Sequence, residues 1–156
     1  MMKTDVTIAV DPGKQGAIAV AYPKPRDVGL HTLRKASFQD VLDIFHDIMI
    51  RSATEGWHCR AWFEMPPKTL GKRVPESAAM VFGFHCGELY GMLRTLRLPL
   101  KTVRPPEYLK YPPEVRKAGA TAKKRYNKDK AAQMFPWLKI PVEAGDALLL
   151  LNYAMT

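Results

Sequence analysis

The chain has 156 residues, 47% of them hydrophobic, which excludes wholesale disorder and is enough for one domain with a sizeable core. Lys and Arg number 24 against 15 Asp and Glu, so the formal net charge is +9 at pH 7. The segment 94–139 carries 13 of the 24 basic residues but 3 of the 15 acidic ones, so it holds the whole excess. This charge suits a phosphate backbone, and the alternative is a solvated surface. We do not expect a membrane as its partner, because no apolar face is interleaved with the charges.

The hydrophobic pattern predicts three strands at the start of the chain, followed by helices that alternate with two further strands. A capping box at Ser37 and Asp40 marks the start of the first helix, and Gly56 ends it. We expect strands at 6–10, 16–22, 29–35, 57–63 and 98–103, and helices at 38–55, 76–96, 127–135 and 143–155. A three-stranded meander followed by alternating helices and strands predicts a single α/β domain over 1–156 with a mixed sheet.

Two acids stand at the ends of predicted strands. Asp11 follows an apolar run and precedes Pro12-Gly13, which stops the strand and turns the chain. Glu64 repeats the arrangement after Trp62-Phe63. Taken singly, such an acid often only caps or turns the chain. Together they predict two strand tips that each present one carboxylate.

A second pair of acids, Glu143 and Asp146, lies at the start of the last predicted helix. Residues spaced i and i+3 share one face of a helix, so these side chains are expected to converge. Carboxylates gathered in this way need a cation, and Mg²⁺, with Mn²⁺ as a substitute, suits oxygen ligands from scattered elements. The expected metal-binding and catalytic acids are Asp11, Glu64, Glu143 and Asp146.

Small residues recur every four positions in the predicted helix 76–96. Glycine costs a helix about 1 kcal/mol relative to alanine, so a stripe of glycines needs a compensating reason, and close packing is that reason. The partner is either the sheet or first helix of the same chain, or the same helix of a second subunit. The stripe consists of Ala79, Gly83, Gly87 and Gly91.

The two cysteines, Cys59 and Cys86, each follow a histidine. Adjacent residues on a strand point to opposite faces and could not both ligate one ion, so we do not expect a zinc site. Asp5 interrupts the N-terminus early, which disfavours a signal peptide, and no apolar run is long enough to span a bilayer. We therefore expect a cytoplasmic protein with reduced thiols.

The acids and their neighbours resemble the RuvC-like Holliday junction resolvases, in particular the short versions carried by phages. The matching runs are 8–13 (IAVDPG), 62–64 (WFE) and 143–148 (EAGDAL), and they occur in the family's order. The resemblance implies a ribonuclease H-like fold with a five-stranded sheet, a homodimer and divalent metal bound by the four acids. It also implies an endonuclease that nicks Holliday junctions and other branched DNA, in the cytoplasm of a bacterial host if a phage encodes it.

Some positions extend this resemblance and others depart from it. The family's two lysines align best with Lys110 and Lys128, with Lys130 a close rival for the second. The third acid is usually Asp, so Glu143 is a departure. Family members tend to have an aromatic wedge where this chain has Pro66-Pro67, which favours a relaxed, structure-selective nuclease. The residues that we expect to bind DNA are Arg104, Lys117, Lys123, Lys124, Arg125 and Lys130.

Two alternative functions stay open. The YqgF-like RNA-processing nucleases share the first acid and its turn, although a Glu at the end of the fourth strand fits the resolvases better. A non-catalytic nucleic-acid-binding module of the same fold is the second alternative, and the retention of four acids argues against it. The run 11–17 also resembles the phosphate-binding turn of sugar kinases and actin-like ATPases. Those proteins need two large lobes that 156 residues cannot build, so we expect no nucleotide cofactor.

Overall fold

The computed structural model describes residues 4–68, 70 and 74–156. The first half of the chain forms β1 (Asp5–Asp11), β2 (Ala17–Ala21), β3 (Val28–Thr32), α1 (Phe38–Glu55), β4 (His58–Glu64) and α2 (Glu76–Thr95). The second half forms β5 (Leu100–Val103), α3 (Pro105–Tyr108), α4 (Pro113–Ala118), α5 (Ala120–Met134), the 3₁₀ turn η1 (Val142–Ala144) and α6 (Gly145–Met155). None of these helices has the length and apolarity to cross a membrane, within the part of the chain that is described.

The strands form one five-stranded sheet in the order β3-β2-β1-β4-β5. The meander β1-β2-β3 is antiparallel, whereas β4 runs parallel to β1 and β5 runs parallel to β4. Parallel neighbours need a crossover, and α1 and α2 supply the two crossovers. These features confirm the predicted α/β class and the predicted mixed five-stranded sheet flanked by helices.

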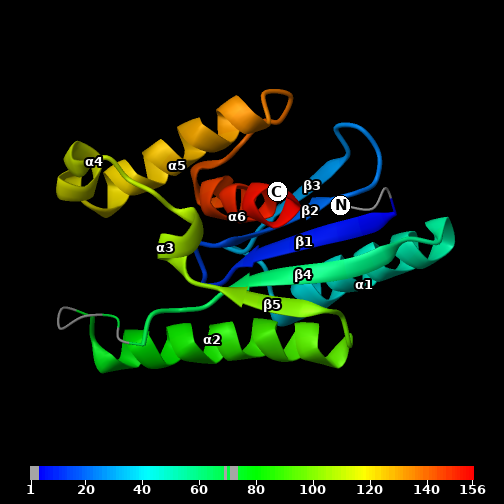
Figure 1. The fold of residues 1–156 in the computed structure, drawn as a ribbon. Coiled ribbons are helices and arrows are strands. Elements are labelled where there is room, and N and C mark those ends of the chain that lie inside the picture. Colours follow the sequence, from blue (N-terminus) through cyan, green and yellow to red (C-terminus); the bar gives the residue numbers. More distant parts are fainter. Residues whose placement is uncertain (1–3, 69, 71–73) are drawn as a thin grey trace.

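Helices cover both faces of the sheet, with α1 and α2 on one side and α3 to α6 on the other (Figure 1). Side chains alternate along β1, so Ile8 packs into the core under α1 and α2, whereas Ala9 packs into the core under α5 and α6. Small alanines line the second face on β1 and β2, and they let α6 lie close to the sheet. Asp11 and Glu64 have the same parity as Ala9 and Trp62, which places both on the α6 face of the strand ends.

The helix α5 begins at Ala120 rather than at 127, and the short helices α3 and α4 precede it. The predicted start was late because the charged run Lys123-Lys124-Arg125 shows no apolar periodicity. Gly119, with a φ of 94°, marks the boundary in a conformation that glycine tolerates well. The alanines at 120 and 122 then favour a helix. This extension adds two turns to the face that α5 presents to α6.

The glycine stripe of α2 faces away from the sheet and from α1. A Cβ built on Gly83, Gly87 or Gly91 would meet nothing within 4 Å. The expectation that the stripe packs inside the same chain is therefore wrong, because the buried face of α2 is the one that carries Cys86, Leu89 and other large side chains. Packing against a second subunit stays a prediction.

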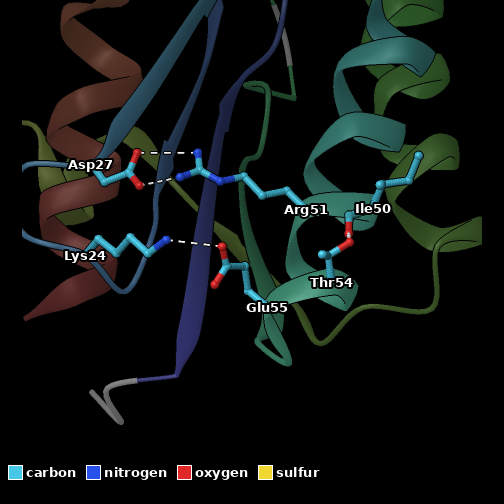
Figure 2. Close-up of polar contacts among 6 residues, drawn as sticks. All are labelled: Lys24, Asp27, Ile50, Arg51, Thr54 and Glu55. Carbon is cyan, nitrogen blue, oxygen red and sulfur yellow. Dashed lines mark hydrogen bonds and ion pairs between the residues drawn. The ribbon is translucent and has the colours of Figure 1, made fainter.

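Charged side chains tie the β2–β3 hairpin to α1, at the end of the sheet opposite Asp11. Figure 2 shows Arg51 against Asp27 and Lys24 against Glu55, where Nζ and Oε1 lie 3.1 Å apart. The Arg51 guanidinium also lies 3.8 Å from the centre of the Tyr22 ring. These contacts hold the hairpin against α1 at a distance from the candidate site. Substitutions there should therefore change the stability of the fold without changing the site.

Candidate active site

The strands β1 and β4 deliver two carboxylates to the same edge of the sheet. They are parallel neighbours with Val10 opposite Phe63, so Asp11 and Glu64 follow side by side at their carboxyl ends. The carboxyl edge of parallel strands is the usual place for a site in an α/β sheet. Asp11 is only 5% exposed, which makes its charge costly unless a cation is near.

The third acid, Asp146, comes from the first turn of α6. This turn lies unusually close to α5, because a Cβ on Gly145 would fall 2.7 Å from the backbone nitrogen of Lys128 and 3.0 Å from the carbonyl carbon of Asn127. Only glycine allows that approach without a shift of the helices. The contact brings Asp146, itself 8% exposed, against side chains of α5 and over the strand ends.

Lys124 of α5 lies between two of the acids. Its Nζ is 2.6 Å from Oδ2 of Asp146 and 3.7 Å from Oδ2 of Asp11. The longer distance is beyond hydrogen-bond reach, and Oδ2 of Asp11 is buried without a hydrogen-bond partner. The ammonium therefore binds Asp146 directly and compensates Asp11 only through space.

Neutral donors hold two of the carboxylates in place. The buried Asn127 donates through Nδ2 to Oδ1 of Asp146 at 2.6 Å, and the same nitrogen lies 2.7 Å from the hydroxyl of Tyr111. The hydroxyl of Tyr108 donates to Oε2 of Glu64. Both tyrosines lie in the segment around α3 and α4, so this segment fixes acids that come from α6 and β4.

The electrostatics show that the site lacks positive charge. Burial raises the pKa of Asp11 well above its ordinary value, and the charge of Glu64 raises it further. The pKa of Glu64 is raised by burial and then by Asp146, although the Tyr108 hydrogen bond opposes the shift. Burial would lower the pKa of Lys124, but Asp11 and Asp146 outweigh it and raise the value, so the side chain stays an ammonium.

The acids open into a cavity of about 650 Å³. Its polar end is formed by Asp11, Glu64, Asp146 and Lys124, and its walls by the β1–β2 turn and the first turns of α2. Phe82 of α2 packs against this turn, with a ring carbon 3.0 Å from where a Cβ of Gly13 would lie. The remaining wall residues are Pro12, Lys14, Gln15, Gly16, Ser77, Ala78 and Val81. The cavity is large enough to admit a phosphate group and its sugar.

Glu143 does not line this cavity. It lies in the 3₁₀ turn η1, and its Oε1 is 3.5 Å from the guanidinium of Arg34, which follows β3. The expected i, i+3 convergence with Asp146 is not seen at the cavity, because Asp146 lines it whereas Glu143 pairs with Arg34 outside it. The Arg34 side chain is 62% exposed, so this ion pair is weak and easily broken.

The lysine that the fold brings to the acids is Lys124, which the sequence analysis assigns only to DNA binding. Lys128, one turn further along α5, and Lys110, whose Nζ donates to the carbonyl oxygen of Pro106, do not line the cavity. A correct start for α5 would have identified Lys124, because Lys124 and Asn127 then share a face with Lys128. Of the other residues expected to bind DNA, Lys123 is half-buried and four are exposed: Arg104, Lys117, Arg125 and Lys130.

The oxygen ligands of the acids suit a divalent cation, but the distances between the acids are too long for one ion to be held by three of them. Three carboxylates and one ammonium leave a formal charge of −2, which one Mg²⁺ or Mn²⁺ would balance. The unpartnered, buried Oδ2 of Asp11 is an available ligand atom of the kind that such ions prefer. Among the described residues, however, no three acids, histidines or cysteines are close enough to hold one ion. Lys124 stands between Asp11 and Asp146, where such an ion would have to bind both.

Comparison with known proteins finds solved structures that are similar at low sequence identity. No protein-family model matches the sequence, and no curated protein is similar to it. The structure of T. thermophilus RuvC in complex with a Holliday junction substrate has a TM-score of 0.49 and 15% identity, over 94% of this chain and 89% of that chain. A second Thermus thermophilus RuvC structure has a TM-score of 0.47 and 13% identity, over 94% of this chain and 90% of that chain.

Proposed function

We propose that this protein is a divalent-metal-dependent endonuclease that nicks branched DNA, with Holliday junctions as its first substrate. The observation that carries the proposal is the convergence of Asp11, Glu64 and Asp146 at the carboxyl edge of the sheet, in an open cavity beside a strongly basic helix. The sequence resemblance described above points to the same activity. Phosphodiester hydrolysis needs charge neutralisation and an activated water, and paired carboxylates that bind Mg²⁺ or Mn²⁺ are a common means of providing both.

Each side chain of the site has a part in this proposal. Asp11, Glu64 and Asp146 would hold the metal, which supplies Lewis acidity and an activated water when bound. Tyr108 keeps Glu64 oriented, and burial together with Glu64 raises the pKa of this tyrosine, so its hydroxyl remains a donor. Asn127 orients Asp146 in the same way. Glu143 would become a further ligand by leaving Arg34.

The basic segment would hold the DNA strands that flank the scissile phosphate. The ammonium of Lys123 lies 5.5 Å from the centre of the Tyr111 ring, and that of Lys130 lies 5.7 Å from the centre of the Tyr126 ring. Both lysines are therefore positioned by cation–π contacts. Such contacts neutralise phosphates and give affinity that falls with salt, without reading a base sequence. Selectivity for branched DNA would then come from shape.

A homodimer would follow from the symmetry of a four-way junction, which needs two nicks. The outward face of α2 is the surface that we propose for it. Gly83, Gly87 and Gly91 leave room for a second backbone there, and Met80 and Phe84 beside them are 77% and 70% exposed. Gly87→Leu should abolish the dimer in analytical ultracentrifugation while the chain stays folded, because a Cβ added at this position meets nothing within 4 Å in the same subunit. An unchanged dimer would place the interface elsewhere.

The substrate class is tested by incubating the protein with synthetic DNA of defined shape. We expect Mg²⁺ or Mn²⁺ to support nicking of four-way junctions, with weaker nicking of three-way junctions and little of linear duplex, and we expect a chelator to stop all of it. A structured RNA in the same assay separates an RNA-processing nuclease from a DNA resolvase. Faster cleavage of the RNA than of every DNA would overturn the proposed substrate.

One observation favours a non-catalytic nucleic-acid-binding module instead. The ammonium of Lys124 already bonds to Asp146, so the acids could serve as a structural ion-pair cluster under a DNA-binding surface. The two functions are distinguished by measuring junction binding and junction cleavage with and without metal. A binding module would hold junctions equally well with and without metal and would leave them intact.

A further inference from the structure

Lys124 lies between Asp11 and Asp146, which suggests a role other than catalysis or DNA binding. We propose that the Lys124 ammonium is the internal counter-ion of the metal-free site, which holds Asp11 and Asp146 together and competes with a divalent ion for the place between them. This role rests on the proposed function, since it requires that these acids bind a metal.

The geometry makes the ammonium and a metal ion mutually exclusive. Nζ of Lys124 is 2.6 Å from an oxygen of Asp146 and 3.7 Å from an oxygen of Asp11. A divalent ion bound by both carboxylates would need ligand distances of about 2.0–2.6 Å to an oxygen of each, and so would lie within the same space as the ammonium. Two cations within this space would repel strongly, because the carboxylates are almost fully buried and little water screens the charges. Lys124 must therefore withdraw before a divalent ion can be held by both acids.

The structure allows that withdrawal without unfolding. The Lys124 side chain is 36% exposed and opens into the cavity, and its four-carbon stem is flexible. The backbone around it stays fixed, because Asn127 on the same face of α5 is buried and bonded to Asp146. The ammonium alone has to move, and the cavity gives it room.

The ammonium leaves the cluster under-neutralised. One positive charge faces the three carboxylates of Asp11, Glu64 and Asp146, and Oδ2 of Asp11 keeps no hydrogen-bond partner. The single charge of Lys124 thus holds the acids in place but leaves part of their negative charge uncompensated, whereas a divalent ion would compensate more of that charge. The neighbouring Lys123 does not share this position, since it lies over the Tyr111 ring. Lys123 is therefore a matched control for the loss of one positive charge on α5.

This competition predicts an effect opposite to that of an ordinary active-site deletion. Lys124→Met removes the ammonium but keeps most of the stem, so no cation has to be displaced when a metal binds. Metal affinity should rise by about tenfold, which is the change that one charge-assisted hydrogen bond typically makes to an equilibrium constant. The same variant should melt at a lower temperature in chelator, because its buried carboxylates then face no counter-ion.

The test is calorimetric titration with Mn²⁺ alone, without DNA, of the wild type, Lys124→Met, Lys124→Arg, Lys123→Met and Asp11→Asn. We expect tighter binding in Lys124→Met, no gain in Lys124→Arg or Lys123→Met, and loss of binding in Asp11→Asn. Lys124→Gln, which keeps a hydrogen-bond donor for Asp146, gives the same comparison if the methionine variant does not stay folded without metal.

The outcomes separate the two proposals. If the wild type binds Mn²⁺ through Asp11 but Lys124→Met and Lys124→Gln bind it equally or more weakly, the counter-ion role is wrong and the metal site stands. If the wild type and Asp11→Asn bind Mn²⁺ alike, or neither these two nor the Lys124 variants bind it, the metal site itself is wrong and the counter-ion role falls with it.

Discussion

Replacing Gly145 by alanine tests the contact that places Asp146 in the site. The added Cβ would lie 2.7 Å from the backbone nitrogen of Lys128 and 3.0 Å from the carbonyl carbon of Asn127. These are backbone atoms of a well-packed helix, so neither can move aside alone. α6 must shift away from α5, and Asp146 in the next position moves with it.

The size of the effect follows from two opposed contributions. Overpacking of this kind costs about 3 kcal/mol, and alanine recovers about 1 kcal/mol over glycine within a helix. The free energy of unfolding should therefore fall by about 2 kcal/mol. For a chain of this length such a loss lowers Tm by roughly 4–8 °C.

The assay is thermal unfolding in chelator, compared with Gly87→Ala at a concentration where sedimentation shows a monomer. An added methyl at Gly87 meets nothing within 4 Å, so the same substitution there should stabilise the helix by about 1 kcal/mol and raise Tm by roughly 2–4 °C. Gly145→Ala should also lose metal affinity, because Asp146 moves away from Asn127. A Gly145→Ala variant that melts at or above the wild-type temperature would refute the close approach of α5 and α6.

Three further predictions concern pH, the hairpin contact and the basic segment. The pKa of Asp11 and that of Glu64 are raised in the folded state, so the metal-free protein binds more protons when folded than when unfolded. Its Tm in chelator should therefore rise as the pH falls from 7 towards the ordinary carboxyl pKa of about 4, and either Mn²⁺ or Asp11→Asn should flatten this rise. Arg51→Ala should cost about 1–2 kcal/mol, since it removes both the ion pair with Asp27 and the close stacking on Tyr22. Lys24→Ala removes a more exposed ion pair and a longer contact of 5.1 Å with the Trp57 ring, so it should cost less than about 0.5 kcal/mol, and equal losses in urea unfolding would contradict this ranking. A triple alanine variant of the basic segment should weaken junction binding and lower the slope of log K against log salt by up to about 3, and an unchanged slope in fluorescence anisotropy would move the DNA path elsewhere; its positions are Lys117, Lys123 and Arg125.

The strand-borne part of the site could be predicted from the sequence because it depends on local signals. Asp11 and Glu64 each end an apolar run before a proline, and parallel pairing of β1 with β4 then brings them together. The strand and helix order followed from hydrophobic periodicity for the same reason. Sequence patterns thus identify which carboxylates stand at strand ends, and the register of β1 against β4 then places these two side by side.

The helix-borne part depended on boundaries and on tertiary contacts that a sequence does not display. The contact of Lys124 with the acids was missed because the start of α5 was set seven residues late. The pairing of Glu143 with Arg34, which follows β3, is a tertiary contact that no local spacing reveals. Tyr108 and Asn127 bond to acids on other elements of the fold, and no spacing rule connects them. The glycine stripe was recognised, but its direction depends on which face of α2 carries the larger apolar side chains.

The proposed function depends most directly on metal-dependent chemistry at Asp11. The measurement is the single-turnover rate of nicking of a four-way junction at saturating protein, for the wild type, Asp11→Asn and the matched control Asp129→Asn, an exposed acid of α5. We predict Mg²⁺-dependent nicking by the wild type and the control, and none by Asp11→Asn, although all three bind the junction. Nicking by Asp11→Asn at the wild-type rate, or by the wild type in chelator, would contradict the account.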